Sequence, residues 1–389
     1  MRLTGRINSS LLADLLVVGL HLSTLLFLIK NYSLLDIKVH NQLLGEYLAA
    51  GSFPIPPGYY FLIFLVDLVI RVKYAFVASS AIVLTFFQWW KYRLVFSSIQ
   101  QEGLGLKTPA VFLLAFSFLF LGPIYLPMID GRFWYLGKFT QTIWHNSTLI
   151  CVFPFCILLV WKTFDWFRSG KLKDLGLMFL LGFIIILIKP SFLFCYIPAL
   201  PLFIFIRDRE LSKGLIQSLA LVSALFAMLM VEKYLIFTWD PVLDSLYTPE
   251  EKSQMVVDPL RIWLHLSQEP IFDFVSSFPL LIGFLILRRK KAFESPLFGF
   301  SLLLLFFAVL VYLLFAETGF REFHANFYWQ IPIALFLCHL SILQSVVKQF
   351  LVEGKKMKGR YILIFSLYII QAASGIGYWL RIFTGSTLS

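Results

Sequence analysis

The chain has 389 residues, of which 59% are hydrophobic and only 14% are charged, and its formal net charge is +11. Soluble domains carry roughly a quarter charged residues, so the composition excludes a soluble globular protein and predicts an all-α polytopic membrane protein. In a soluble protein this positive charge would suggest nucleic acid. Here we expect no nucleic-acid partner, because basic residues in short loops orient membrane helices.

The first predicted element is an apolar span over residues 11–29, which follows Arg2 and Arg6. No small-residue cleavage site separates it from Lys30, so we expect an anchored helix and not a signal peptide. Ten more apolar segments approach the length that a transmembrane helix needs. They cover residues 74–96, 109–128, 149–167, 175–188, 191–206, 215–237, 274–287, 296–315, 327–347 and 361–380. We therefore predict one transmembrane domain over residues 1–389 with about 11 spans.

Residues 59–72 are apolar but too short for a clear span. If they do not cross the membrane, most Lys and Arg residues fall on the side of the N-terminus, as expected for cytoplasmic loops. We therefore predict a helix that lies along, or dips into, the outer interface. This topology puts the N-terminus in the cytoplasm. The external connectors are then residues 30–73, 129–148, 238–273 and 317–326, which hold most of the acidic residues and four of the six histidines.

The first external loop carries Asp36, His40 and Glu46 ahead of a Pro-Pro-Gly turn at residues 56–58. In a helix, Asp36 and His40 are four residues apart and share one face, where they can share a proton or a ligand. A carboxylate at the membrane surface can also activate a hydroxyl or bind a divalent cation. The alternative is a solvated interfacial helix whose charges only face water.

The second external loop places polar residues among aromatic rings, a combination that suits a sugar face or a lipid headgroup. Its candidate residues are Asp130, Arg132, His145 and Asn146. The alternative is an interfacial belt of Trp and Tyr, which membrane proteins form generally.

Two later segments carry basic groups that can meet phosphate. Lys189 lies between two short spans, where it can contact a lipid phosphate or snorkel to the headgroups. In the turn at residues 317–326, Arg321 can bind phosphate bidentately. That turn also holds Glu317, His324 and Asn326, and it can equally be a salt-bridged surface turn.

With these residues in view, the chain resembles the GT-C class of polytopic glycosyltransferases, most closely bacterial members with three short motifs. These motifs are an Asp-x-x-x-His pair, a WHNPT-like helix start and a HGNFxW-like turn. Here they read Asp36 to His40, Trp144-His145-Asn146-Ser147-Thr148 and His324-Ala325-Asn326-Phe327-Tyr328-Trp329. Ser147 replaces the usual Pro and Ala325 the usual Gly, and Asp36 stands alone where other members have an Asp-Asp or Glu-Asp pair.

The resemblance implies a sugar donor on a polyprenyl phosphate and a lipid-linked or cell-envelope glycan acceptor, at the outer face of a bacterial inner membrane. It implies that Asp36 acts as general base, and Asp130 is the second carboxylate to test. Arg321, Lys189 or His324 would stabilise the charge on the released lipid phosphate. We expect the other candidates to contact substrate: Glu46, Arg132, His145, Asn146, Glu317 and Asn326. The resemblance assigns no certain cofactor; a divalent cation at Asp36 stays open, with its ligands unknown.

Two other functions fit the same composition. O-antigen polymerases and ligases also act on lipid-linked glycans, but they use a late loop rich in arginine, whereas residues 238–273 hold only Arg261. A glycan or lipid transporter (flippase) would perform no chemistry, and would carry charged residues in mid-span or inverted repeats. Apart from Asp14 and the pair Glu232-Lys233, both near span ends, the predicted spans lack such charges.

Overall fold

The computed structural model describes residues 4–32, 35–72, 76–102, 105–132, 134–238, 240, 242, 248, 251–353 and 359–384. About 78% of the described residues are helical, and many of the helices are long and apolar, so the chain is an all-α polytopic membrane protein. Among the described residues, seven helices are long and apolar enough to cross a membrane, or eight if the bent pair α13 and α14 forms one span. The predicted number of about 11 spans therefore stays a prediction.

The seven helices are α1 (Thr4–Asn31), α7 (Ser147–Ser169), α9 (Ser191–Asp208), α10 (Lys213–Thr238), α15 (Pro296–Leu314), α16 (Ile331–Glu353) and α17 (Gly359–Ile382). Two more predicted spans form long helices that fall outside this set, α4 (Val77–Glu102) and α8 (Leu172–Ile188). The first contains Lys91, Arg93 and Glu102, and the second has 17 residues.

Two predicted spans are interrupted. Helix α5 (Thr108–Phe118) ends well before residue 128, because the chain then continues through Gly122 and Pro123 in a non-helical segment. The segment over residues 274–287 is broken into α13 (Pro270–Ser277) and α14 (Pro279–Arg288), which are bent by 63°. In both places a proline removes the N–H that a continuous helix needs.

The non-helical segment after α5 is held against α17 by a close backbone approach. Gln371 donates from Nε2 to the carbonyl of Gly122, 3.0 Å away, and the Gly122 amide donates to the Gln371 carbonyl. A Cβ on Gly375 would lie 1.5 Å from the carbonyl oxygen of Phe120. Only glycine allows this approach, which brings the chain from α5 to the loop that precedes α7.

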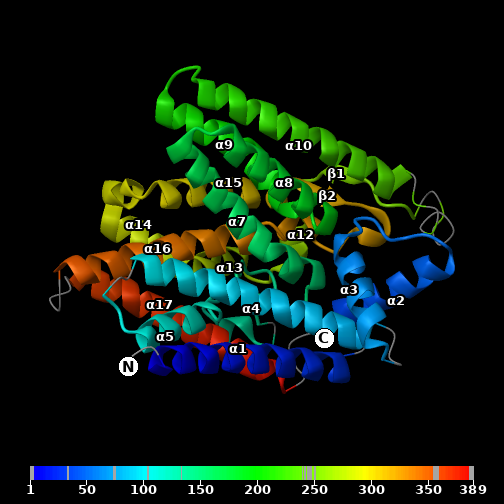
Figure 1. Ribbon diagram of the computed structural model, residues 1–389, viewed down its shortest axis with the longest axis horizontal. Coiled ribbons are helices and arrows are strands. Elements are labelled where there is room, and N and C mark those ends of the chain that lie inside the picture. The colour runs from blue at the N-terminus through cyan, green and yellow to red at the C-terminus, as the bar shows by residue number, and fades with distance from the viewer. Residues whose placement is uncertain are drawn as a thin grey trace.

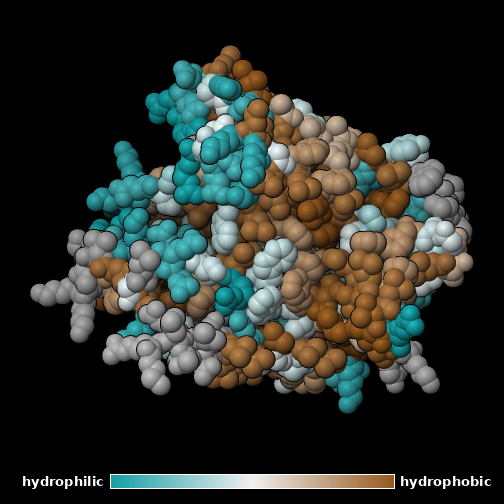
Figure 2. Space-filling model, viewed as in Figure 1, coloured by the Kyte–Doolittle hydropathy of each residue, from teal (hydrophilic) through white to brown (hydrophobic). Residues whose placement is uncertain are grey.

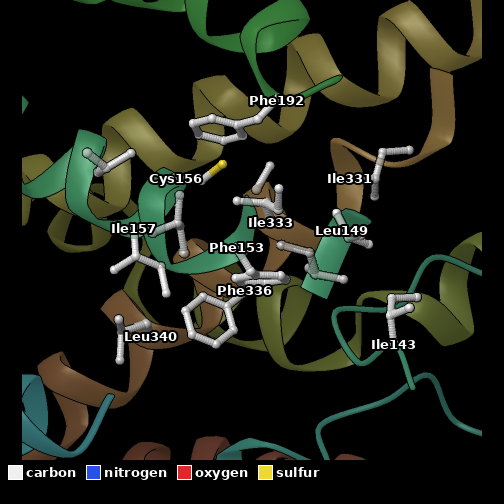
Figure 3. Packing of buried hydrophobic residues seen from close by; sticks show 14 of the residues in the cluster. Ile143, Leu149, Phe153, Cys156, Ile157, Phe192, Ile331, Ile333, Phe336 and Leu340 are labelled. Atoms are coloured by element: carbon white, nitrogen blue, oxygen red, sulfur yellow. The ribbon is translucent and has the colours of Figure 1, made fainter. Parts of the chain in front are cut away.

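The core lies along α7 and α16. Of the most apolar 18-residue stretch of each helix, 72% is buried in α7 and 89% in α16, against 33–44% in the other five candidate spans. Figure 3 shows Phe153 and Phe336 facing each other inside this core, with ring centroids 4.9 Å apart. Around it, α8 and α4 pack on α7, and α15 packs on both α16 and α9. Figure 2 shows an apolar surface across much of the visible face, as expected where lipid replaces water.

The predicted helix at residues 59–72 is present as α3 (Gly58–Ile70), and the first external loop also forms α2 (Asp36–Ala49). Two short strands, β1 (Met255–Val257) and β2 (Phe315–Glu317), pair antiparallel with Met255 opposite Glu317. The smaller helical segments are α6 (Pro127–Asp130), α12 (Arg261–Leu266), η1 (Arg289–Glu294), η2 (Gly319–Arg321) and η3 (Asn326–Tyr328). In Figure 1, α2, α3 and the strands gather towards the right-hand end of the bundle.

Candidate functional site

The first turn of α2 presents Asp36 and His40 on one face, as the sequence predicted. His40 Nε2 lies 3.4 Å from Asp36 Oδ1. The other carboxylate oxygen, Oδ2, accepts a hydrogen bond of 2.7 Å from the backbone amide of Ser147. The early aspartate is therefore joined to the histidine of its own helix and to a loop 111 residues further along the chain.

Ser147 is the first residue of α7, and the cap of that helix explains why its amide is available. Asn146 is the N-cap, and its Oδ1 accepts from the amide of Leu149 at 2.9 Å. The Ser147 amide, at the buried start of the helix where no intrahelical partner is available, then donates to Asp36, and the positive end of the helix dipole favours a carboxylate there. Asn146, predicted to contact substrate, thus caps a helix. His145 is half-buried beside it, 6.4 Å from the ring of Trp329.

The carboxyl group of Asp36 is held in its charged form. Burial alone would raise its pKa, but His40 and the Ser147 amide bring the pKa below its usual value. Burial lowers the pKa of His145, and the nearby Asp36 charge opposes that shift. Asp36 is therefore an anion that orients and stabilises a neighbouring cation more readily than it takes up a proton.

Lys189, at the end of α8, enters the same region. Its Nζ donates to Thr148 Oγ1 at 3.0 Å and lies 5.6 Å above the ring of Trp329. Burial lowers the pKa of Lys189 to about 8, although the charges of Asp36 and Glu317 act in the opposite direction. Among the residues that the structure describes, no carboxylate is within ion-pair distance of Nζ. Its charge is thus available to an anionic ligand.

The turn after β2 brings a second cation near Glu317. Glu317 is 6% exposed and accepts from Asn326 Nδ2, and burial raises its pKa. The Arg321 guanidinium stacks 5.2 Å from the ring centroid of Phe237 and 5.1 Å from that of Phe320. In the described part of the chain it forms no ion pair within 4.0 Å. It lies within electrostatic reach of Glu317, as Lys189 does.

His324 and Ala325 complete this turn. The His324 amide donates to the Arg321 carbonyl, and the residue is exposed at the surface. Partial desolvation of the ring and then the Arg321 charge lower the pKa of His324, and the Asp36 charge opposes that shift. Ala325 has a φ of 51°, in the left-handed region that favours glycine. This conformation is a physical reason for the glycine found at this point of the similar motif.

We call the assembled residues the outer polar cluster, after the side of the membrane that the sequence predicts for the first loop. The cluster is formed by α2, α3, the start of α7, the α8–α9 junction, and the end of β2 with the turn after it. Its members are Asp36, His40, Tyr60, His145, Ser147, Lys189, Glu317, Arg321, His324 and Asn326. The first loop and the two histidine-bearing turns therefore lie close together, and their role as a substrate site stays a prediction.

Three predicted site residues lie outside the outer polar cluster: Glu46, Arg132 and Asp130. Glu46 is exposed and accepts from Gln42 Nε2 at 2.8 Å. Arg132 is exposed, and its carbonyl accepts from Arg381 at 2.7 Å.

Asp130 binds the buried Lys138 Nζ at 2.9 Å, and Asp273 binds the same nitrogen at 2.9 Å. The structure thus gives Asp130 a position in an ion triad between the second external loop and α13. The ion pairs of Lys138 with Asp130 and Asp273 were not predicted from the sequence, because Asp273 is distant from the other two residues along the chain.

The sequence also missed two tyrosines. Tyr60 hydrogen-bonds His40 Nδ1 at 2.6 Å, and Tyr47 donates to Asp240 at the start of the longest external loop. The position of Tyr60, two residues after the Pro-Pro-Gly turn, was the only signal in the sequence. No group of three or more His, Cys, Asp or Glu residues within the described ranges is arranged to hold a metal ion.

Comparison with known proteins adds no name to this site. No protein-family model matches the chain, and no curated protein matches it. The functional conclusion therefore rests on the outer polar cluster and on the short motifs that led to it.

Proposed function

We propose that the chain is a GT-C-like membrane glycosyltransferase that moves a sugar from a polyprenyl-phosphate donor to a lipid-linked or cell-envelope glycan acceptor. In this proposal about 11 spans cross a bacterial inner membrane, and the outer polar cluster faces the periplasm. The observation that carries it is the juxtaposition of an Asp–His pair with two cations, Lys189 and Arg321, that have no carboxylate within ion-pair distance among the described residues.

Each half of that juxtaposition matches one requirement of the reaction. The Asp36–His40 pair can take the proton from an acceptor hydroxyl. The donor is a phosphodiester, and its lipid phosphate gains a negative charge when the sugar leaves. Lys189 and Arg321 are positioned to stabilise that charge, and a guanidinium binds phosphate bidentately. The ring of Trp329 beside Lys189 offers an apolar face of the kind that stacks on sugars.

The cluster favours an enzyme over a transporter because it combines a base with phosphate-binding groups at one end of the bundle. The direct test uses purified protein in lipid nanodiscs with a panel of labelled polyprenyl-phosphate sugars and lipid-linked glycan acceptors. We expect acceptor-dependent release of polyprenyl phosphate. Absence of turnover with every donor, together with movement of the labelled lipid across liposome membranes, would favour the transporter.

The titration of Lys189 predicts how donor binding depends on pH. Because burial lowers the pKa of Lys189 to about 8, the ammonium is charged below that pH and becomes neutral above it. Donor affinity measured by calorimetry should therefore fall as the pH rises from 7 to 9.5. Lys189→Arg keeps its charge throughout this range, so its affinity should stay flat. An identical decline in both proteins would remove Lys189 from the phosphate site.

A further inference from the structure

A chain of three side chains runs from α3 into the outer polar cluster. The Tyr60 hydroxyl lies 2.6 Å from His40 Nδ1, and His40 Nε2 lies 3.4 Å from Asp36 Oδ1. The far carboxylate oxygen is fixed by the Ser147 amide at 2.7 Å. The three groups come from two helices joined by the Pro-Pro-Gly turn, so their alignment depends on how α2 and α3 pack.

The positions of the protons follow from which groups can donate and which can accept a hydrogen bond. An ionised carboxylate only accepts hydrogen bonds, so the hydrogen of a neutral imidazole belongs on Nε2, facing Asp36. The lone pair of Nδ1 then faces Tyr60, and the tyrosine hydroxyl donates to it. This is the order of groups in an acid–histidine–hydroxyl triad, with a phenol at the hydroxyl position.

We propose that Tyr60, His40 and Asp36 form a proton relay in which Tyr60 is the group that receives the proton of the acceptor hydroxyl. The inference rests on the proposed glycosyl transfer and deepens it, because it assigns direct contact with the acceptor to Tyr60 and an orienting role to Asp36. The low pKa of Asp36 agrees with that division of roles, since a strongly stabilised carboxylate is a weak base.

The step balances in atoms and charge. The acceptor oxygen forms a bond to the anomeric carbon as its proton passes to the Tyr60 oxygen, and the Tyr60 proton passes to His40 Nδ1. The bond from the anomeric carbon to the phosphate oxygen breaks, and its electron pair stays on the lipid phosphate. His40 ends as an imidazolium beside Asp36 and then returns its proton to water.

The surroundings of Tyr60 supply both the rigidity and the charges that the relay needs. Tyr60 is 4% exposed, and its ring packs edge-on to His40 with centroids 5.4 Å apart. The charged and titratable groups near the relay come from α2, α3, the loop before α7, the end of α8 and the turn after β2: Tyr47, Tyr59, His145, Lys189, Arg321 and His324.

The neighbouring Tyr59 provides a matched control. Its side chain is also buried, and its hydroxyl forms no hydrogen bond with His40 or Asp36. Tyr60→Phe should lower kcat about 100-fold or more with unchanged donor affinity, the range of a lost acid–base group. Tyr59→Phe should keep kcat and its pH profile. His40→Asn combined with Tyr60→Phe should lose no more than the worse single variant, because relay members act as a unit.

A second measurement does not need turnover. Tyr60 occupies Nδ1, so diethyl pyrocarbonate should modify His40 severalfold faster in Tyr60→Phe than in wild type, while Tyr59→Phe reacts like wild type. Peptide mass spectrometry reports the rate at His40 alone. Equal rates in all three proteins, or full turnover by Tyr60→Phe, would overturn the relay. If wild type turns over no donor, the glycosyltransferase proposal fails, and the modification rates still decide whether Tyr60 and His40 are coupled.

Discussion

Asp36→Asn is expected to slow sugar transfer by about 10³- to 10⁴-fold, the scale seen when the acid of an acid–histidine pair becomes an amide. The asparagine oxygen can still accept from the Ser147 amide, so α2 should stay in place. Its NH₂ group would then face His40 Nε2 and require a lone pair there. The imidazole hydrogen moves to Nδ1, and His40 can no longer accept a proton from the Tyr60 side.

The measurement is a single-turnover transfer rate, with donor affinity and thermal unfolding recorded on the same protein. Gln42→Ala on the exposed face of α2 is the matched control, since it changes a polar side chain without approaching Asp36. Transfer at the wild-type rate in Asp36→Asn would remove Asp36 from the mechanism. A loss of rate that accompanies an equal loss in Gln42→Ala would indicate damage to α2 itself.

Local spacing was enough to predict the Asp36–His40 pair, because four residues are one turn of helix and the contact needs no tertiary information. The short helix α3 was also predictable, from an apolar run bounded by a Pro-Pro-Gly turn. The hydrogen bond between Tyr60 and His40 could not be predicted from the sequence, because it depends on the angle at which α2 and α3 pack. The end of α5 at Phe118 was missed because apolar residues continue past it, although Gly122 and Pro123 were a signal in the sequence; contacts with α17 then hold the non-helical segment.

The role of Asp130 could not be predicted from the sequence for a different reason. A carboxylate in an external loop with aromatic neighbours has the sequence character of a site residue, and only the fold reveals its partner. Lys138 Nζ is fully buried, 2.9 Å from both Asp130 and Asp273, 2.7 Å from Ser276 Oγ and 4.2 Å from the ring centroid of Phe272. Residue type and loop position therefore could not separate a structural carboxylate from a catalytic one.

Lys138→Met is accordingly expected to destabilise the protein by about 3–5 kcal/mol, the cost of removing one partner from a buried ion group. The side chains of Asp130 and Asp273 are 3% and 5% exposed, so without the ammonium two carboxylates would face each other with little water. Thermal and denaturant unfolding in detergent should report the loss. Lys290→Met, at an exposed lysine of η1, should leave stability near wild type.

Adding Asp130→Asn and Asp273→Asn to Lys138→Met should restore a large part of the lost stability, because neutral amides no longer repel each other. Their oxygens can still accept the hydrogen bonds that the Leu126 amide and the Ser267 hydroxyl now donate to the carboxylates. Recovery in the triple variant would mean that the stability of this region depends on charge balance, and that the role of Asp130 is to balance the charge of Lys138. If Lys138→Met unfolds no more readily than Lys290→Met, the triad contributes little. Asp130 would then be free to act as a second carboxylate, and Asp130→Asn alone would have to be assayed for sugar transfer beside Asp36→Asn.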